Sequence, residues 1–149
     1  MKTLIIYASI HHGNTEKIAN VMAEGLNADL MKMSKLNPKS LADYDLIGFG
    51  SGIYYGKFHK DIIKLIDNLP ELLNRKAFVF STSGQGKKSY NSSIEIGLKN
   101  KGFQIIGSFA CKGYDTFGPF KVIGGIAKGR PDNDDLKNAM DFVKEIKGL

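Results

Sequence analysis

Near the start of the chain, the apolar run Leu4-Ile5-Ile6-Tyr7 leads through Ser9-Ile10-His11-His12-Gly13-Asn14-Thr15 into a helical pattern that runs from Glu16 to Leu26. The first backbone N–H groups of a helix have no acceptor within the helix, and the helix dipole places partial positive charge there. A strand that passes into a helix through small, hydroxyl-bearing residues is therefore typical of a phosphate-binding loop.

The residue types in this loop suit a phosphate. Ser9 and Thr15 offer hydroxyl donors, and Gly13 allows the backbone to come close to a ligand. The alternative is a turn that only caps the helix, which Asn14 or Thr15 can do alone. This segment by itself leaves both interpretations open.

Apolar runs alternate with helical periodicity along the whole chain, and this pattern predicts a parallel sheet covered by helices on both faces. Five βα units joined by right-handed crossovers make a doubly wound α/β three-layer sandwich. Ligands of such sheets bind outside the carboxyl ends of the strands, so the loops after the first, third, fourth and fifth strands are the ones to examine. The predicted strands are Lys2–Ala8, Ala28–Met33, Asp45–Ser51, Lys76–Thr82 and Phe103–Cys111.

Helices are predicted between and after these strands. Ser92 and Glu95 have the spacing of a capping box, and the acidic run Asp132–Asp135 supplies a cap and negative charge at the start of a final helix that Lys147-Gly148 closes. The buried stripes are Ile18, Val21, Met22 and Leu26 in the first helix, Ile62, Ile63, Ile66 and Leu69 in the second, Ile94 and Leu98 in the third, and Leu136, Ala139, Met140, Val143 and Ile146 in the last.

Length and composition predict one domain, residues 1–149, because 42% hydrophobic residues are enough for an ordinary core. No stretch approaches the roughly 18 apolar residues of a membrane span, and no signal peptide is evident, so we expect a soluble, cytoplasmic protein. Cys111 cannot form an internal disulfide and is expected to be a buried thiol. The net charge of +6 favours acidic partners or anionic lipid, although the scattered lysines resemble solvated surface and form no nucleic-acid motif.

Two further loops look able to bind a flat ligand. Gly50–His59 follows the third strand and contains three glycines and two tyrosines, whose flat faces can stack on a planar ring. Ser81–Gly86 follows the fourth strand and is rich in hydrogen-bond donors. Together with Ser9–Thr15 they place one phosphate site and two ring-binding loops along one edge of the sheet, which suits a phosphorylated, flat cofactor.

Other chemistries are not supported. His11, His12 and His59 all fall in these loops, but they lack cysteine or carboxylate partners at zinc-site spacing, so we expect no metal and histidines that contact phosphate or flank a ring. Lys88 stands where a Walker A loop needs Ser or Thr, and Gly84-Gln85-Gly86 fails as a dinucleotide fingerprint at Ser89. The long irregular stretch Lys112–Pro131, rich in glycine and aromatic residues, either contributes to function or packs over the sheet edge.

Over nearly its whole length the chain resembles the flavodoxin-like family, whose strand order is 2-1-3-4-5. The resemblance is carried by Tyr7-Ala8-Ser9 leading into Gly13–Ala19, which is similar to the family's FMN-phosphate loop and first helix. It implies that Ser9–Thr15 wraps the FMN phosphate and that Ser51–Gly56 and Ser81–Gly86 flank the isoalloxazine. The residues expected to bind the cofactor are Ser9, Ile10, His11, His12, Gly13, Asn14, Thr15, Ser51, Gly52, Ile53, Tyr54, Tyr55, Gly56, Thr82, Ser83, Gly84, Gln85 and Gly86.

The resemblance implies an FMN-binding flavodoxin, a low-potential carrier that passes electrons between redox partner proteins and has no dedicated catalytic acid or base. Gly52 or Gly56 is expected to change peptide orientation when the flavin is reduced, and Tyr54 or Tyr55 to stack on its ring. The alternative is an FMN-dependent oxidoreductase, because Gly50–His59 also resembles the corresponding loop of menaquinone-dependent protoporphyrinogen oxidases, which implies a quinone or porphyrinogen substrate.

Overall fold

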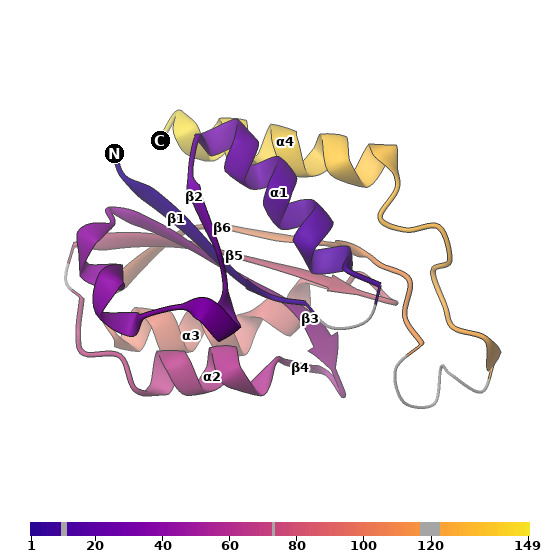
Figure 1. The fold of residues 1–149 in the computed structure, drawn as a ribbon, viewed down its shortest axis with the longest axis horizontal. Coiled ribbons are helices and arrows are strands. Elements are labelled where there is room, and N and C mark those ends of the chain that lie inside the picture. The colour runs from indigo at the N-terminus through magenta and orange to yellow at the C-terminus, as the bar shows by residue number, and fades with distance from the viewer. Residues whose placement is uncertain (10–11, 73, 117–122) are drawn as a thin grey trace.

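The computed structural model describes residues 1–9, 12–72, 74–116 and 123–149 (Figure 1). Five parallel strands form the sheet in the order β2-β1-β3-β5-β6, and this confirms the predicted order because β5 and β6 are the fourth and fifth parallel strands. The sixth strand, β4, is a two-residue antiparallel addition to β3. The strands are β1 Thr3–Ala8, β2 Asp29–Lys32, β3 Leu46–Tyr54, β4 Lys57–Phe58, β5 Arg75–Ser83 and β6 Phe103–Lys112.

Helices cover both faces of the sheet and give the predicted three layers (Figure 1). Helices α1 (Asn14–Leu26) and α4 (Asn133–Lys147) lie together on one face, and α2 (Lys60–Asp67) and α3 (Ser92–Asn100) lie on the other. Each helix packs through the apolar stripe that its sequence predicts. Among the described residues, no helix combines the length and apolarity that a membrane span requires.

The two faces of the sheet bury separate cores. The core beneath α2 and α3 gathers around Phe49 and Ile62, while the core beneath α1 and α4 gathers around Phe78 and Phe80. On this second face the two Phe rings lie directly over glycines of the neighbouring strand: a Cβ on Gly48 would fall 2.3 Å from the Phe78 ring. The central strand β3 therefore needs glycine where these rings pack.

Two expectations about helices are wrong. The described residues form four βα units with an α-helix rather than five, because β2 and β3 are joined by short 3-10 turns at Met33–Lys35 and Pro38–Asp43. Ser92 does not form a capping box, because the 3-10 turn Lys88–Asn91 runs straight into α3 without a break where a cap could act. Instead, the buried amide of Asn91 donates hydrogen bonds to the Ser108 hydroxyl and the Phe109 carbonyl of β6.

The predicted cap of the last helix is confirmed. Asp132 accepts a hydrogen bond from the Asp135 backbone N–H, and the Asp135 carboxylate accepts one from the Asp132 N–H, which completes a capping box. Arg130 adds a two-pronged ion pair to the Asp135 carboxylate, with N–O distances of 2.6 and 2.7 Å. This pair, which ties the long loop after β6 to α4, also holds the pKa of Asp135 below its usual range.

Candidate functional site

The loops that follow β1, β3 and β5 meet at one end of the sheet, as predicted, and the segment after β6 joins them. They enclose a cavity of about 30 Å³, which holds little more than a water molecule. The residues that line it are Asn14, Thr15, Gly52, Ile53, Tyr54, Thr82, Ser83, Gly113, Tyr114 and Asp115. Seven of these ten residues were predicted from the sequence to bind the cofactor, and the other three, Gly113, Tyr114 and Asp115, come from the segment after β6.

The start of α1 has the features of an anion-binding helix terminus. Gly13 occupies the N-cap position in a left-handed conformation with φ of 66°, and no side chain of the described residues caps the first N–H groups of the helix. A Cβ on Gly13 would meet nothing within 4 Å, so the space beside this backbone is open. The alternative that Asn14 or Thr15 merely caps the helix is therefore wrong, because neither side chain accepts from the first N–H groups of α1.

The side chains of Asn14 and Thr15 are directed to neighbouring loops instead. Asn14 Nδ2 donates to the Tyr114 carbonyl over 2.7 Å, and its buried Oδ1 has no hydrogen-bond partner among the described residues. Thr15 is buried and its hydroxyl shares a hydrogen bond of 2.8 Å with the hydroxyl of Thr82 at the end of β5. One of these two hydroxyls keeps a proton that it can donate elsewhere.

Ser9 lies on the other side of this loop. Its hydroxyl is buried and unpartnered among the described residues, and Ser9 lines a second cavity of about 280 Å³ between the ends of β1 and β2 and the start of α2. Ser9 and Thr15 therefore line different cavities. Ile10 and His11, which were also expected to bind the cofactor, lie outside the described residues.

The second predicted loop is a hairpin rather than an open loop. Strand β3 continues to Tyr54, which pairs with Lys57 of β4, so that only Tyr55 and Gly56 form the turn. Both turn residues have positive φ, 50° and 79°, as a type I′ turn requires. The prediction that this strand ends at Ser51 is therefore wrong. The strand continues to Tyr54 because its last residues pair with β4.

This hairpin places its predicted residues in different environments. The Ser51 hydroxyl is fully buried and used within the fold, since it accepts from the His59 N–H and donates to the Gly52 carbonyl. Tyr54 turns back over Gly52, where a Cβ would fall 2.7 Å from the tyrosine oxygen, and so lines the small cavity. Tyr55 is 76% exposed at the tip of the hairpin.

The third predicted loop is held down by its own hydrogen bonds. The Gly86 N–H donates to the Ser83 hydroxyl over 2.7 Å, and Gln85 accepts from the hydroxyl of Tyr90. Gly84 is covered by Ile126 of the segment after β6, since a Cβ on Gly84 would fall 2.2 Å from the Ile126 side chain. Thr82 and Ser83 line the small cavity, whereas Gly84, Gln85 and Gly86 do not.

The segment after β6 contributes residues that no local pattern singled out. Gly113 passes so close to Asn14 that a Cβ would fall 2.7 Å from its amide nitrogen. The Tyr114 ring packs on His12 with 4.3 Å between ring centroids, and His12 Nε2 lies 3.0 Å from the Thr116 hydroxyl. The only signal in the sequence was the unusual length and glycine content of this loop, and residues 117–122 of it lie outside the described part.

The two described histidines, His12 and His59, both contact other residues of the chain. His12 contacts Tyr114 and Thr116 of the segment after β6. His59 caps α2, because its Nδ1 accepts from the Asp61 backbone N–H over 3.0 Å, while its ring meets the Tyr54 ring edge-on at 5.8 Å. The predicted roles of His12 and His59 at a phosphate or a ring stay predictions, and His11 is not described.

Two buried groups near these loops keep their protons at neutral pH. Burial, together with the charge of Glu16 and a hydrogen bond to it, raises the pKa of Tyr7 to about 12. Burial and the neighbouring charge of Asp135 raise the pKa of the Cys111 thiol to about 12. The expectation of a buried thiol is confirmed, and the high pKa makes Cys111 a poor nucleophile.

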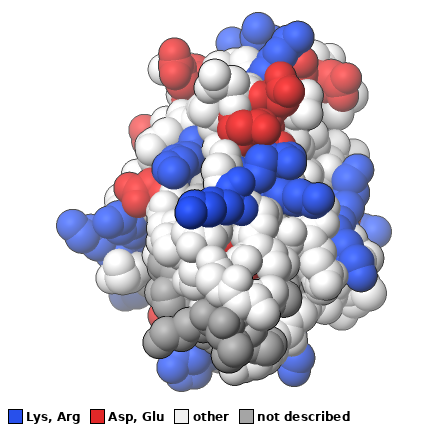
Figure 2. Space-filling model, turned by 90° about the vertical axis from the view of Figure 1, so that its right-hand side faces the viewer, with Lys and Arg blue, Asp and Glu red and all other residues white. Residues whose placement is uncertain are grey.

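Charge is unevenly distributed over this end of the molecule. Figure 2 looks at the end to which the parallel strands point, with α1 and α4 above and α2 and α3 below. Asp and Glu lie mostly in the upper half, whereas the lower half carries Lys and Arg with little acidic surface.

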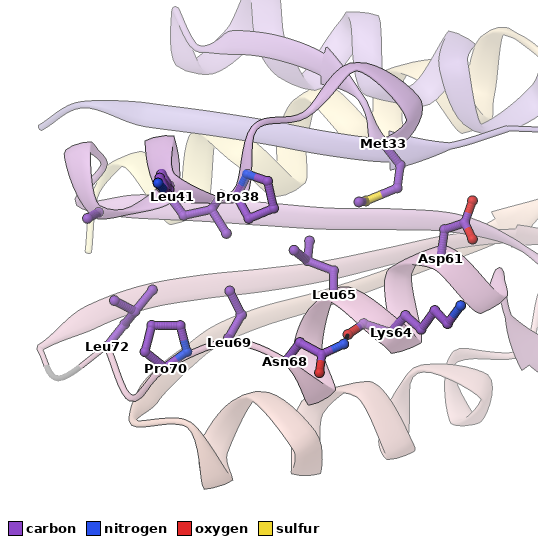
Figure 3. A pocket seen from close by; sticks show the side chains of 12 residues that line it. Met33, Pro38, Leu41, Asp61, Lys64, Leu65, Asn68, Leu69, Pro70 and Leu72 are labelled. Carbon is purple, nitrogen blue, oxygen red and sulfur yellow. Dashed lines mark hydrogen bonds between the residues drawn. The ribbon is translucent and has the colours of Figure 1, made fainter.

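A larger cavity of about 450 Å³ lies away from these loops, between the 3-10 turn Pro38–Asp43 and α2 (Figure 3). Met33 and Leu41 face Leu65 and Leu69 across it. This cavity exists because a short turn replaces the helix that would otherwise cover β1 and β2. Its walls are mainly apolar, and α2 adds the polar side chains of Asp61, Lys64 and Asn68 at its edge.

The polar groups at the loops match part of a phosphorylated flavin. The uncapped N–H groups of α1 and the unpartnered Ser9 hydroxyl are donors that suit a phosphate, and the unpartnered Asn14 oxygen is an acceptor that suits a hydroxyl. The small cavity is too narrow for a three-ring system, so a flat ring requires the Tyr54 side chain or its neighbours to move aside.

Comparisons with known proteins agree with the fold. A family model described as a flavodoxin domain matches residues 4–113. The chain is 51% identical over 148 residues to an uncharacterised protein of Methanocaldococcus jannaschii, with 98% of each chain covered. It is 28% identical over 153 residues to the flavodoxin-like domain-containing protein BilS of Clostridioides difficile, covering 97% of this chain and 85% of that protein.

Solved structures give the same result. Oxidised flavodoxin 2 of Bacillus cereus superposes with a TM-score of 0.76 at 22% identity, covering 99% of both chains. A flavodoxin mutant of Fusobacterium nucleatum bound to flavin mononucleotide superposes with a TM-score of 0.72 at 14% identity, covering 99% of this chain and 96% of that one. At these identities the likeness establishes the fold alone, but the family match spans most of the chain: the protein belongs to the flavodoxin domain family.

Proposed function

We propose that this protein binds FMN at the ends of β1, β3 and β5 and serves as an electron carrier between redox proteins. The observation that carries the proposal is the start of α1, where the helix terminus has no side-chain cap among the described residues and the space beside Gly13 is open. Buried polar atoms without a described partner lie in the same loop, on Ser9 before Gly13 and on Asn14 after it. Family membership supports a flavin as the ligand, because relatives of this fold include a flavodoxin bound to flavin mononucleotide.

The chain's own residues would divide the work of binding. Backbone N–H groups at the start of α1 and the Ser9 hydroxyl would hold the phosphate, and Asn14 Oδ1 would accept from a hydroxyl of the ribityl chain. Tyr54, which lines the cavity, would stack on the ring, since the Tyr55 side chain is exposed at the tip of the hairpin. FMN supplies the one- and two-electron chemistry when bound.

The glycine expected to respond to flavin reduction is Gly56 rather than Gly52. Gly56 lies in the turn with φ of 79° and with nothing within 4 Å of a Cβ, so its peptide has room to turn. Gly52 is held within β3 and covered by Tyr54. An oxidoreductase acting on quinone or porphyrinogen stays an alternative prediction.

The proposal is tested with the purified protein. We expect a visible flavin spectrum, or its appearance when FMN is added to flavin-free protein. In the double variant Ser9→Ala/Thr15→Ala, FMN affinity is expected to fall at least about tenfold while riboflavin affinity changes little, because only FMN carries a phosphate that needs these donors.

Ser93→Ala provides the control, since it removes an exposed hydroxyl from α3 and is expected to leave both affinities unchanged. Equal losses for FMN and riboflavin in the double variant would reject the phosphate assignment. Failure of the wild-type protein to bind either flavin would reject the proposed function altogether.

A further inference from the structure

We infer that the cavity between the 3-10 turn Pro38–Asp43 and α2 binds a small molecule with an apolar body and one carboxylate group, such as a fatty acid of medium chain length. We call this cavity the side cavity. It lies away from the loops at which FMN is proposed to bind, so the inference does not rest on the proposed function. Three observations carry it: the size of the cavity, its apolar walls and the position of its charged residues.

The side cavity has the size and the walls of a ligand pocket. Its volume of about 450 Å³ falls within the roughly 300–1,000 Å³ that is usual for small-molecule sites. Leu41, Leu65 and Leu69 line it and are buried members of the core beneath α2 and α3, so this part of the wall is rigid. An apolar ligand that fills the cavity removes both its own apolar surface and that of the walls from water, which favours binding.

The side cavity is apolar at one end and polar at the other (Figure 3). Leu41 and Leu72 lie toward the apolar end. Asp61 lies near Met33 at the other end, and the Lys64 side chain extends in that direction. A molecule with an apolar chain and a single polar head therefore fits in one orientation, with its head toward Lys64.

Lysines outnumber carboxylates around the polar end. Met33 and Asp61 also line the second cavity, of about 280 Å³, so the two cavities adjoin, and Lys32 lines that second cavity. Lys32 and Lys64 are exposed, and neither forms an ion pair among the described residues. Asp61 is the one carboxylate among the residues that line the two cavities. The local charge therefore favours an anionic head over a cationic one.

A small molecule fits the side cavity better than a partner protein does. A stable protein interface takes about 20–30 residues from each side. Twelve residues line the side cavity, and Leu41 and Leu65 face each other across it. A recess enclosed from two sides in this way holds a compact ligand, whereas a protein partner needs a broader face.

The first test titrates the purified protein with decanoate by isothermal titration calorimetry. We expect saturable binding at one site, with an affinity that rises about threefold for each methylene added from hexanoate to decanoate. Decyltrimethylammonium, which has the same chain and the opposite charge, should bind at least about tenfold more weakly. Equal affinities for the two would overturn the assignment of a carboxylate head.

Methyl NMR locates the bound chain within the protein. Methyl signals of Leu41, Leu65 and Leu69 should shift as decanoate is added. Those of Val143 and Ile146 provide the control and should stay in place, because they belong to the core on the opposite face of the sheet. Saturable binding that leaves the three leucine signals unchanged would place the ligand elsewhere and overturn the inference.

Lysine substitutions test the position of the head. Lys32→Met/Lys64→Met removes both charges but keeps the apolar part of each side chain, and should weaken decanoate binding about fivefold or more. The matched control Lys35→Met/Lys60→Met makes the same change in net charge on exposed residues that line neither cavity, and should change the affinity less than about twofold.

Two further outcomes would overturn the inference. Equal effects of the two lysine double variants would mean that the net charge of the protein, rather than the lysines at the cavity, attracts the anion. Decanoate binding that does not saturate would mean that no defined site exists. Both outcomes are independent of the flavin, because FMN binding is followed separately by the visible spectrum.

Discussion

Helices α1 and α4 start at the same end of the molecule and lie side by side, but their N-termini are built in opposite ways. At the start of α4, polar groups are paired within the chain. Asp132 and Asp135 form a capping box, and Arg130 forms an ion pair with the Asp135 carboxylate. The start of α1 has no side-chain cap, and buried polar atoms of Ser9 and Asn14 beside it lack partners among the described residues. The capping groups of α4 stabilise its start, and we propose that the uncapped start of α1 serves ligand binding instead.

The largest effect is expected from a substitution at the capped N-terminus of α4. Asp135→Ala should lower the free energy of unfolding by about 2–3 kcal/mol, because it removes the charge-assisted hydrogen bonds to Arg130 and half of the capping box. Urea unfolding at neutral pH measures this loss. Asp134→Ala, an exposed acidic neighbour in the same turn, should cost only a few tenths of a kcal/mol.

The same pair predicts a pH dependence. The pKa of Asp135 is lowered in the folded protein from its ordinary value of 3.8, so its contribution is complete above that pH and is lost as the pH falls below it. The unfolding free energy of the wild type should therefore drop more steeply in acid than that of Asp135→Ala. Parallel curves for the two proteins below pH 4 would contradict this assignment.

A smaller effect is expected at the cap itself. Asp132→Ala should cost about 1 kcal/mol, since it removes the side-chain acceptor for the Asp135 N–H. Asp132→Asn keeps an acceptor and should stay close to the wild type in the same unfolding experiment. If Asn proved as damaging as Ala, the charge of Asp132 beside Arg130 rather than its capping hydrogen bond would be the source of stability.

The smallest effect is expected at the open terminus. In flavin-free protein, Ser9→Ala should change the free energy of unfolding by less than about 0.5 kcal/mol, or raise it, because the buried hydroxyl it removes has no described partner. Thermal or urea unfolding without ligand tests this directly. A loss above about 1 kcal/mol would mean that Ser9 holds the fold together as Asp135 does, and the contrast between the two helices would disappear.

Much of the fold could be predicted because its signals are local. The parallel strands are apolar runs, and each was located to within a few residues, while Asp132 marked the start of α4 through a capping pattern that spans only four residues. The hairpin escaped prediction because its turn, Tyr55-Gly56, lacks the Asn or Asp that usually marks a type I′ turn. The missing helix between β2 and β3 left no comparable signal beyond Pro38.

The sequence predicted which loops form the candidate site, but not which side chains within each loop are available to a ligand. Small and polar residues after three strands identified the loops that meet at the cavity, but no sequence pattern could show which side chains the fold would use for itself. Ser51 is an example, since its hydroxyl accepts a hydrogen bond from the His59 N–H and donates one to the Gly52 carbonyl. The contact between His12 and Thr116 joins residues 104 positions apart and therefore depends on the tertiary structure alone.

Cys111 gives the protein an internal reporter of its own opening. It lies at the end of β6, 8% exposed, and is the chain's one cysteine, with a pKa raised to about 12. Burial and the raised pKa both slow the reaction of this thiol with an alkylating reagent at neutral pH, so we expect labelling to proceed mainly through local opening of the fold around Cys111. The rate of Cys111 alkylation therefore measures how often the fold opens locally, and no probe has to be engineered into the protein.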